Sequence, residues 1–343
     1  MIDHIDQVPL LATLTSTSGG NAPLVFLKVN IGSNRAGTIP NTPSSTSLIT
    51  ALLASETAGT CILHGVYSHA GHSYATRTDW AAMQILSDEF SGLQSVASTI
   101  QALRPEHAPL VLSVGATPTA TTIQHPDLSS PTNSDSTPAE ALTTHLKSLL
   151  TTLKTSNFAL EVHAGVYPTL DMQQLAAHAR DITLLNSSLI AISVLADIVS
   201  LYPTRGPNSS TEALVNAGSL ALGREPCEAL GSGDYCAWGM VMPWGELVKE
   251  EGDGGKKYPV PGPDFPAVHG GWEVAKISQE HGVLRWEGKN EDEVPLHVGQ
   301  RVRIWPNHSC ITGAGHAYYL VVDSRNTGKE DEIVDVWERW NGW

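Results

Sequence analysis

The stretch that decides the fold is residues 61–119, "CILHGVYSHAGHSYATRTDWAAMQILSDEFSGLQSVASTIQALRPEHAPLVLSVGATPT". It opens with a β-rich apolar run, continues through a long segment with apolar residues three and four positions apart, and closes with a second apolar run. Such runs are typical of buried parallel strands, and the spacing between them is typical of an amphipathic helix. Thr78 is suited to cap that helix just before Asp79. The stretch therefore predicts a strand–helix–strand unit.

The same alternation continues on both sides of this stretch. Apolar runs at 24–32 and 158–167 predict two further strands, and helical spacing recurs at 44–56, 137–156 and 171–186. Strands that alternate with helices at this spacing indicate a parallel sheet of βα units. We therefore expect residues 1–186 to form an α/β domain.

The pattern changes after about residue 186. Helical periodicity fades, and short strand-like runs follow at 189–203, 272–286, 298–310, 317–323 and 332–337. The Gly- and Pro-rich segment 249–271 is expected to be an exposed loop. Residues 187–343 are thus predicted to form a mostly β domain.

Composition excludes several classes of protein. The chain has 343 residues and a formal net charge of -15, which disfavours binding to nucleic acid phosphates or to anionic membrane surfaces. No apolar run is long enough to span a bilayer, and the first residues resemble neither a signal peptide nor a transit peptide. Four widely spaced cysteines do not suggest a disulfide framework. A reducing, cytoplasmic location is the expectation.

One pair of metal-capable side chains stands near the end of the chain. In "VRIWPNHSC" (302–310), His308 and Cys310 are two positions apart, so along a strand they would point to the same face. Imidazole and thiolate suit zinc, and a pair leaves coordination positions open, as catalytic zinc sites do. The alternative is a buried cysteine beside a surface histidine.

A second candidate is an anion site at the end of the strand in "SVGATPT" (113–119). Gly115 and Ala116 would let backbone N–H groups approach a phosphate, and Thr117 adds a hydroxyl group. Loops at this end of a βα barrel often bind phosphate. A plain βα turn is the alternative explanation.

Aromatic and histidine residues gather at two further strand ends. In "HGVYSHAGHSY" (64–74), Tyr67 and Tyr74 could stack on a planar cofactor, whereas His69 and His72 are more simply ordinary loop residues than metal ligands. "EVHAGVYPT" (161–169) has a similar arrangement at the end of the next strand.

Taken in order, seven segments resemble one enzyme family. They look like the metal-activated pyridoxal-phosphate enzymes of the eukaryotic, fungal-type D-serine dehydratase and D-threonine aldolase family, and the resemblance runs along nearly the whole chain. The segments are "FLKVNIGSNRAG" (26–37), "GVYSHAGHSY" (65–74), "SVGATPT" (113–119), "EVHAGVYPTLDMQQ" (161–174), "LVNAGSLALGRE" (214–225), "ISQEHGVLRW" (277–286) and "VRIWPNHSC" (302–310).

The resemblance implies a fold and a set of ligands. The fold would be the C-terminal half of an alanine-racemase-like (β/α)8 barrel followed by a β domain, with pyridoxal phosphate at the barrel mouth and zinc nearby. His308 and Cys310 would bind zinc, and the cysteine favours the dehydratases over the aldolases. The residues implied to bind the cofactor are Arg35, Tyr67, Tyr74, Gly115, Ala116, Thr117, Gly165, Val166 and Tyr167.

The resemblance also implies an activity, the elimination of D-serine to pyruvate and ammonia, in a homodimer of the complete form. D-threonine aldolase activity is the alternative within the family. The family's Schiff-base lysine lies at the end of the first barrel strand, and about a hundred residues that would contain it have no match here. Two interpretations stay open: a fragment of an active enzyme, or a non-catalytic protein that keeps a zinc site.

Overall fold

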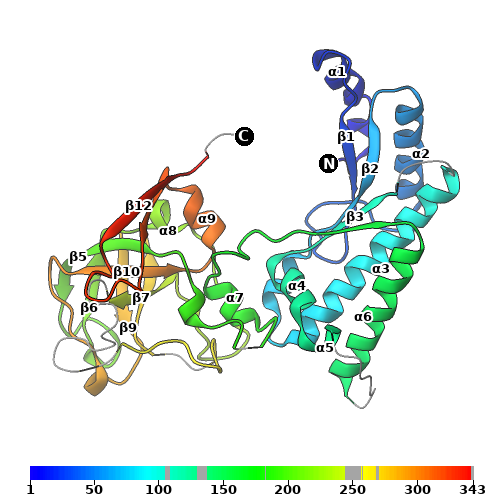
Figure 1. Cartoon of the computed structure of the whole chain (residues 1–343). Coiled ribbons are helices and arrows are strands. Elements are labelled where there is room, and N and C mark those ends of the chain that lie inside the picture. The colour runs from blue at the N-terminus through cyan, green and yellow to red at the C-terminus, as the bar shows by residue number, and fades with distance from the viewer. Residues whose placement is uncertain are drawn as a thin grey trace. The chain divides into compact units, whose positions relative to one another are not determined.

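The computed structural model describes residues 1–104, 109–129, 137–181, 183–243, 256, 258–267 and 270–340 (Figure 1). The chain forms two compact units. Unit 1 comprises Met1–Gly165 with Ala177–Asp181, and unit 2 comprises Val166–Ala176 with Ile182–Trp343. Within the described residues, no helix combines the length and the apolarity that crossing a bilayer requires.

Unit 1 is built around a parallel sheet whose four strands follow the order of the sequence, β1-β2-β3-β4. Each of the four predicted apolar runs supplies one strand, so the predicted parallel α/β arrangement is confirmed for this sheet. The strands are β1 (Leu24–Lys28), β2 (Ile62–Tyr67), β3 (Val111–Val114) and β4 (Ala159–Val162).

The long helices of unit 1 begin at threonines that suit helix starts. Thr42, Thr78 and Thr137 precede α2 (Pro43–Thr57), α3 (Asp79–Leu103) and α6 (Pro138–Thr155), and each hydroxyl accepts a backbone N–H of the first turn. Such caps satisfy N–H groups that have no partner inside the helix. The shorter elements are η1 (Ile5–Gln7), α1 (Leu10–Thr17), η2 (Gly71–Ala75), α4 (Thr117–Thr121), η3 (Thr122–Gln124) and α5 (Pro126–Ser129).

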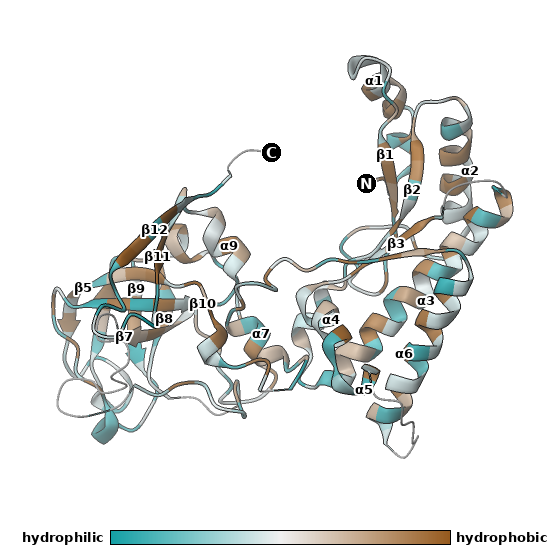
Figure 2. Cartoon of the chain, viewed as in Figure 1, coloured by the Kyte–Doolittle hydropathy of each residue, from teal (hydrophilic) through white to brown (hydrophobic). Residues whose placement is uncertain are grey.

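The two faces of this sheet differ in polarity. Leu27, Val66 and Leu112 lie in register on β1, β2 and β3, and all three are fully buried in one core with residues of α2, α3 and α6. Figure 1 shows these helices on the same side of the strands, and Figure 2 shows β1 and β2 as mostly hydrophobic. Burial of this apolar face holds unit 1 together.

The next register position carries polar side chains on the opposite face, because successive residues of a strand alternate between faces. We call these four residues the polar row: Lys28, Tyr67, Ser113 and Glu161, paired strand to strand. The polar row lies at the C-terminal ends of the strands: Lys28 and Tyr67 are the last residues of β1 and β2, and β3 and β4 continue for one residue beyond the row. The candidate cofactor site is predicted at these ends.

Unit 2 is a closed antiparallel barrel, in the order β10-β5-β6-β9-β8-β7, with a separate two-stranded sheet of β11 and β12. The strand-like run predicted at 272–286 forms two antiparallel strands, β8 and β9. The strands are β5 (Val194–Tyr202), β6 (Glu212–Val215), β7 (Gly239–Pro243), β8 (Trp272–Ile277), β9 (Gly282–Trp286), β10 (Arg301–Pro306), β11 (Tyr318–Val322) and β12 (Ile333–Glu338). The helical turns are α7 (Met172–Ala177), η4 (Ser187–Leu189), η5 (Pro207–Ser209), α8 (Ser219–Leu222), η6 (Asn290–Asp292) and α9 (Ser309–Ala314).

Two local predictions are wrong. The helix expected over 171–186 ends at Ala177, because His178 adopts a positive φ of 49°, which an α-helix cannot continue. Part of the segment expected to be an exposed loop, 249–271, instead lines the core of unit 2, where the side chains of Tyr258 and Phe265 are buried. Residues 244–255, 257 and 268–269 of that region lie outside the described residues.

Candidate functional site

The strand ends of unit 1 bring several predicted residues together around the polar row. The Tyr67 ring stacks on the His163 ring, with centroids 4.5 Å apart and planes 7° from parallel. Lys28 Nζ lies 4.4 Å from the centroid of the Tyr67 ring. The arrangement combines flat aromatic surfaces with a buried amine, which suits a planar, anionic ligand.

Hydrogen bonds determine which ring nitrogen of His163 carries the proton. The Ser113 hydroxyl donates to Glu161 Oε1 at 2.6 Å, so its oxygen accepts from His163 Nδ1 at 3.1 Å. The proton on Nδ1 leaves Nε2 as an acceptor, and this buried atom has no hydrogen-bond partner among the described residues. Burial lowers the pKa of His163, which favours the neutral ring. A ligand with a hydrogen-bond donor would satisfy Nε2.

The loop from β3 to α4 depends on Gly115. Its φ is +136°, and a Cβ there would lie 2.3 Å from the His163 carbonyl oxygen. Glycine is therefore required both by the backbone conformation and by this close approach. The Gly115 carbonyl also faces His69 Nδ1 at 3.0 Å, which joins the β2 and β3 strand ends.

Two backbone donors of this loop already have acceptors. Gly115 N–H donates to Glu89 Oε1 at 3.3 Å, and Ala116 N–H donates to the Thr119 hydroxyl at 3.0 Å. Thr117 follows as the first residue of α4. A phosphate in this loop would compete with Glu89 or Thr119 for these two groups.

Glu89 is a buried residue of this site that the sequence analysis missed. Its carboxyl group, on α3, also accepts hydrogen bonds from the hydroxyls of Ser68 at 2.7 Å and Thr119 at 3.1 Å. Burial raises the pKa of Glu89, and these hydrogen bonds oppose the rise. Glu89 therefore ties the β2 and β3 strand ends to α3.

The remaining predicted cofactor residues belong to both units. Arg35 is exposed, but its charge reaches the strand ends, because it contributes to the lowered pKa of both Lys28 and His69. Burial is the larger cause of each shift and brings the pKa of His69 to about 4. Tyr74 lies in η2 of unit 1. Gly165 is the last residue of the first segment of unit 1, whereas Val166 and Tyr167 belong to unit 2, where Val166 is buried and Tyr167 is exposed.

The predicted metal ligands lie in unit 2, at a junction of strand and helix rather than on a strand. β10 ends at Pro306, His308 is the N-cap of α9, and Cys310 lies in the first turn of that helix. The expectation that strand alternation aligns the two side chains is therefore wrong. The direction of each side chain depends instead on its position at the start of α9.

Buried hydrogen bonds hold the segment that carries this pair. The Asn307 amide accepts from the Tyr235 hydroxyl at 2.8 Å and donates to the Ala237 carbonyl at 2.7 Å. Asp171, completely buried before α7, accepts the Ser309 N–H at 3.0 Å. The segment is thus fixed on both sides of His308, as ligand positioning requires.

The pKa shifts of the two side chains have opposite effects on metal binding: the shift of His308 favours it, and the shift of Cys310 opposes it. Burial lowers the pKa of His308, so the imidazole is neutral and able to coordinate. Desolvation of the thiol, followed by the negative charge of Asp171, raises the pKa of Cys310. A cation bound there would have to displace the thiol proton. No group of three or more His, Cys, Asp or Glu residues within the described ranges could hold a metal ion.

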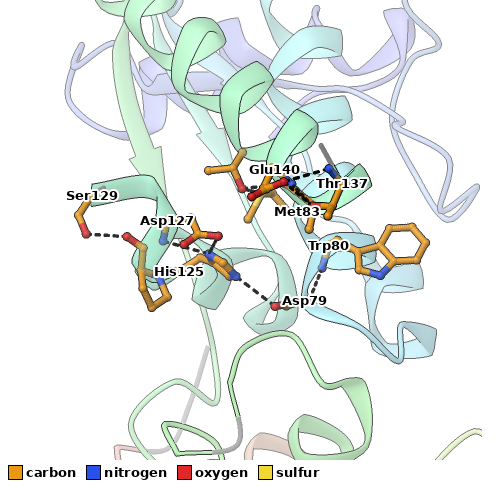
Figure 3. A network of polar contacts seen from close by, with 11 residues as sticks. Asp79, Trp80, Met83, His125, Asp127, Ser129, Thr137 and Glu140 are labelled. Carbon is orange, nitrogen blue, oxygen red and sulfur yellow. Dashed lines mark hydrogen bonds and ion pairs between the residues drawn. The ribbon is translucent and has the colours of Figure 1, made fainter. Parts of the chain in front are cut away.

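Another histidine–carboxylate network lies in unit 1, at the start of α3. Figure 3 shows His125 between two aspartates, with Nε2 3.1 Å from Asp79 and Nδ1 3.8 Å from Asp127. Asp79 is also the first residue of α3, where a negative charge stabilises the helix. These contacts join the start of α3 to the α5 region.

Sequence comparison places this architecture among known enzymes. The chain is 30% identical to D-serine dehydratase of Saccharomyces cerevisiae over 344 residues, covering 100% of this chain and 68% of the relative. It is 33% identical to D-serine dehydratase of Schizosaccharomyces pombe, covering 100% of this chain and 67% of the relative. The chain belongs to the D-serine dehydratase family. It spans about two thirds of the length of these relatives, and the family model "Putative serine dehydratase domain" matches residues 191–322.

Solved structures agree on the fold of this D-serine dehydratase family member. D-threo-3-hydroxyaspartate dehydratase from Delftia sp. HT23 is 23% identical, with a TM-score of 0.65, and the match covers 100% of this chain and 72% of that chain. An alanine-racemase-like protein from Idiomarina loihiensis is 21% identical, with a TM-score of 0.61 and coverages of 100% and 71%. The alanine-racemase-like architecture is therefore shown.

Proposed function

We propose that the chain acts in the dehydration of D-serine to pyruvate and ammonia, as a lyase that uses pyridoxal phosphate and zinc. The observation that carries this proposal is the match along the whole chain to two fungal enzymes named D-serine dehydratase. The supporting geometry is a polar, aromatic strand-end site in unit 1 and a braced imidazole–thiol pair in unit 2.

The strand ends of unit 1 are the proposed place for pyridoxal phosphate. When bound, this group withdraws electrons from the Cα of an amino acid and so eases loss of its proton. His163 Nε2 would accept a hydrogen bond from the ligand, and Tyr67 would offer a flat contact surface. The proposed phosphate and ring contacts are Arg35, Tyr67, Tyr74, Gly115, Ala116, Thr117, Gly165, Val166 and Tyr167.

His308 and Cys310 are the proposed zinc ligands. When bound, zinc would supply Lewis-acid assistance to a departing hydroxide, because a zinc ion lowers the pKa of a bound water far below its value in bulk solvent. A structure of D-threo-3-hydroxyaspartate dehydratase, 24% identical to this chain, is of a cysteine-to-alanine variant in a metal-free form, and this supports the assignment. The role of the chain is to hold one imidazole nitrogen and one thiolate in fixed positions and to leave coordination sites for substrate.

The proposal extends to the organisation of the chain. We assign residues 1–186 to part of a pyridoxal-phosphate-binding (β/α)8 barrel and residues 187–343 to the dehydratase-type β domain with the zinc pair. The substrate is a small D-amino acid, and a homodimer is the proposed assembly.

The test is a product assay on the purified full chain with added pyridoxal phosphate and zinc. The proposal predicts pyruvate and ammonia from D-serine, in equal amounts, and none from L-serine. Glycine and acetaldehyde from D-threonine would instead identify an aldolase. Zinc binding without any turnover of D-serine, D-threonine or D-threo-3-hydroxyaspartate would contradict turnover by this chain and would fit both a fragment of an active enzyme and a non-catalytic protein that keeps a zinc site.

A further inference from the structure

Gln173 contacts the first of the two proposed zinc ligands. Its side-chain oxygen lies 2.7 Å from His308 Nδ1, and its side chain is only 7% exposed. Gln173 stands 135 positions before His308 in the sequence, in the first turn of α7. Its backbone N–H also donates to the Asn307 carbonyl at 3.2 Å, so α7 is joined to this segment twice.

The orientation of the Gln173 amide is determined by a second contact. Its Nε2 donates to the Pro226 carbonyl at 2.6 Å, and a carbonyl can only accept. A flipped amide would place two oxygens against each other there. Oε1 therefore faces His308, and an amide oxygen cannot donate.

This contact decides which nitrogen of His308 carries the proton. Because Oε1 accepts, Nδ1 must be the protonated atom. A neutral imidazole has only one N–H, so the lone pair lies on Nε2, the nitrogen that would coordinate a metal. Outer-shell partners of this kind orient metal-binding histidines and strengthen them as ligands.

We propose that Gln173 is the positioning residue that presents His308 Nε2 to a zinc-type divalent cation shared with the Cys310 thiolate. The inference rests on the proposed zinc site. Removing such a partner typically weakens metal binding by about 10–100-fold.

Two substitutions separate this role from simple packing. Gln173→Glu keeps an acceptor for Nδ1 but loses the donor to Pro226, whereas Gln173→Leu keeps the volume and loses both. If Gln173 orients His308, Gln173→Glu binds zinc within about threefold of the wild type or more tightly, and Gln173→Leu binds about 10–100-fold more weakly. If Gln173 only fills space, the leucine variant is the less damaged, because it buries no new charge.

Zinc affinity of the full chain is measured by competition with a chromophoric chelator, with His308→Ala as reference and Gln279→Leu, at an exposed glutamine of unit 2, as control. A glutamate variant that binds more weakly than the leucine variant would overturn the inference, as would a leucine variant that binds like the wild type. If His308→Ala binds like the wild type, the zinc assignment itself fails, and the inference fails with it.

A second measurement needs neither zinc nor a folded variant. Long-range ¹H–¹⁵N NMR of the metal-free wild-type chain reports the His308 tautomer directly. The inference predicts protonation at Nδ1. Protonation at Nε2 would overturn it even if the pair binds zinc.

Discussion

Asp171 accepts the backbone N–H of Ser309, the residue between the two proposed zinc ligands, at 3.0 Å. The same carboxyl group accepts the Gln174 N–H at 2.9 Å and so caps α7. One buried side chain therefore organises both α7 and the segment of the zinc pair.

Replacing Asp171 by alanine should destabilise unit 2 strongly. The change leaves the N–H groups of Ser309 and Gln174 without their acceptor in a buried place, at a cost of about 1–3 kcal/mol each. Urea denaturation should show a loss of about 2–4 kcal/mol in the free energy of unfolding. Asp331→Ala, at an exposed position of unit 2, is the control, and an equal loss of stability there would contradict the organising role of Asp171.

The buried carboxyl group of Glu89 should stabilise unit 1 as the carboxyl group of Asp171 stabilises unit 2. Glu89→Ala removes the acceptor for the Ser68 hydroxyl, Gly115 N–H and Thr119 hydroxyl, so a loss of about 3 kcal/mol is expected. Asp88→Ala, one residue away but exposed, should cost about 0.5 kcal/mol or less. Chemical denaturation of both variants checks the difference, and similar losses would show that the buried network has little effect.

The close contact at Gly115 can be tested by comparison with Gly59, which also has a positive φ but where an added Cβ would contact no other atom. At Gly59, φ is +75° and no atom lies within 4 Å of an added Cβ, so Gly59→Ala should cost about 1 kcal/mol. Gly115→Ala adds a clash with the His163 carbonyl and should cost clearly more. Equal midpoints of thermal unfolding for the two variants would rule out the close approach.

His69 should make the stability of unit 1 sensitive to acid. Burial, followed by the charges of Arg35 and Lys28, lowers the pKa of His69 from 6.5 to about 4 in the folded chain. Between these values the unfolded chain binds more protons, so stability falls as the pH is lowered from about 6.5 to 4. The full shift corresponds to about 3 kcal/mol, and partial solvent screening reduces it.

His69→Asn should reduce this acid-dependent loss of stability. Asparagine keeps a donor for the Gly115 carbonyl but does not titrate. Denaturation series at pH 7, 5.5 and 4 should give a flatter profile than for the wild type. His145→Asn, at an exposed position on α6, should keep the wild-type profile, and identical profiles for both variants would refute the role of His69.

The strands of unit 1 could be predicted because their apolar runs are short, continuous and bounded by small residues. Tyr67 and Gly115 could be placed at strand ends, since the end of each apolar run marks the edge of the sheet. The predicted directions of His308 and Cys310 were wrong, because they assumed that the strand continues past Pro306. The helix predicted to continue past His178 was also wrong, because the positive φ of His178 depends on the fold around it.

The supporting residues were harder to find, because each acts through a partner distant in sequence. Glu89 accepts from Gly115, 26 positions later, and a single glutamate in a helix normally indicates an exposed face. A signal did exist, since Glu89 is three residues after Leu86 and four before Leu93, within the buried stripe of α3. For Asp171, its place three residues before Gln174 fitted a helix cap, but nothing local pointed to Ser309.

The proposed function depends on zinc binding by His308 and Cys310. Elemental analysis and chelator competition test it on the purified chain, on His308→Ala and Cys310→Ala, and on His281→Ala as an exposed control. We expect one zinc per wild-type and control chain, and a loss of affinity in each pair variant larger than the about 10–100-fold expected for an outer-shell partner. Unchanged zinc content and affinity in both pair variants would contradict it.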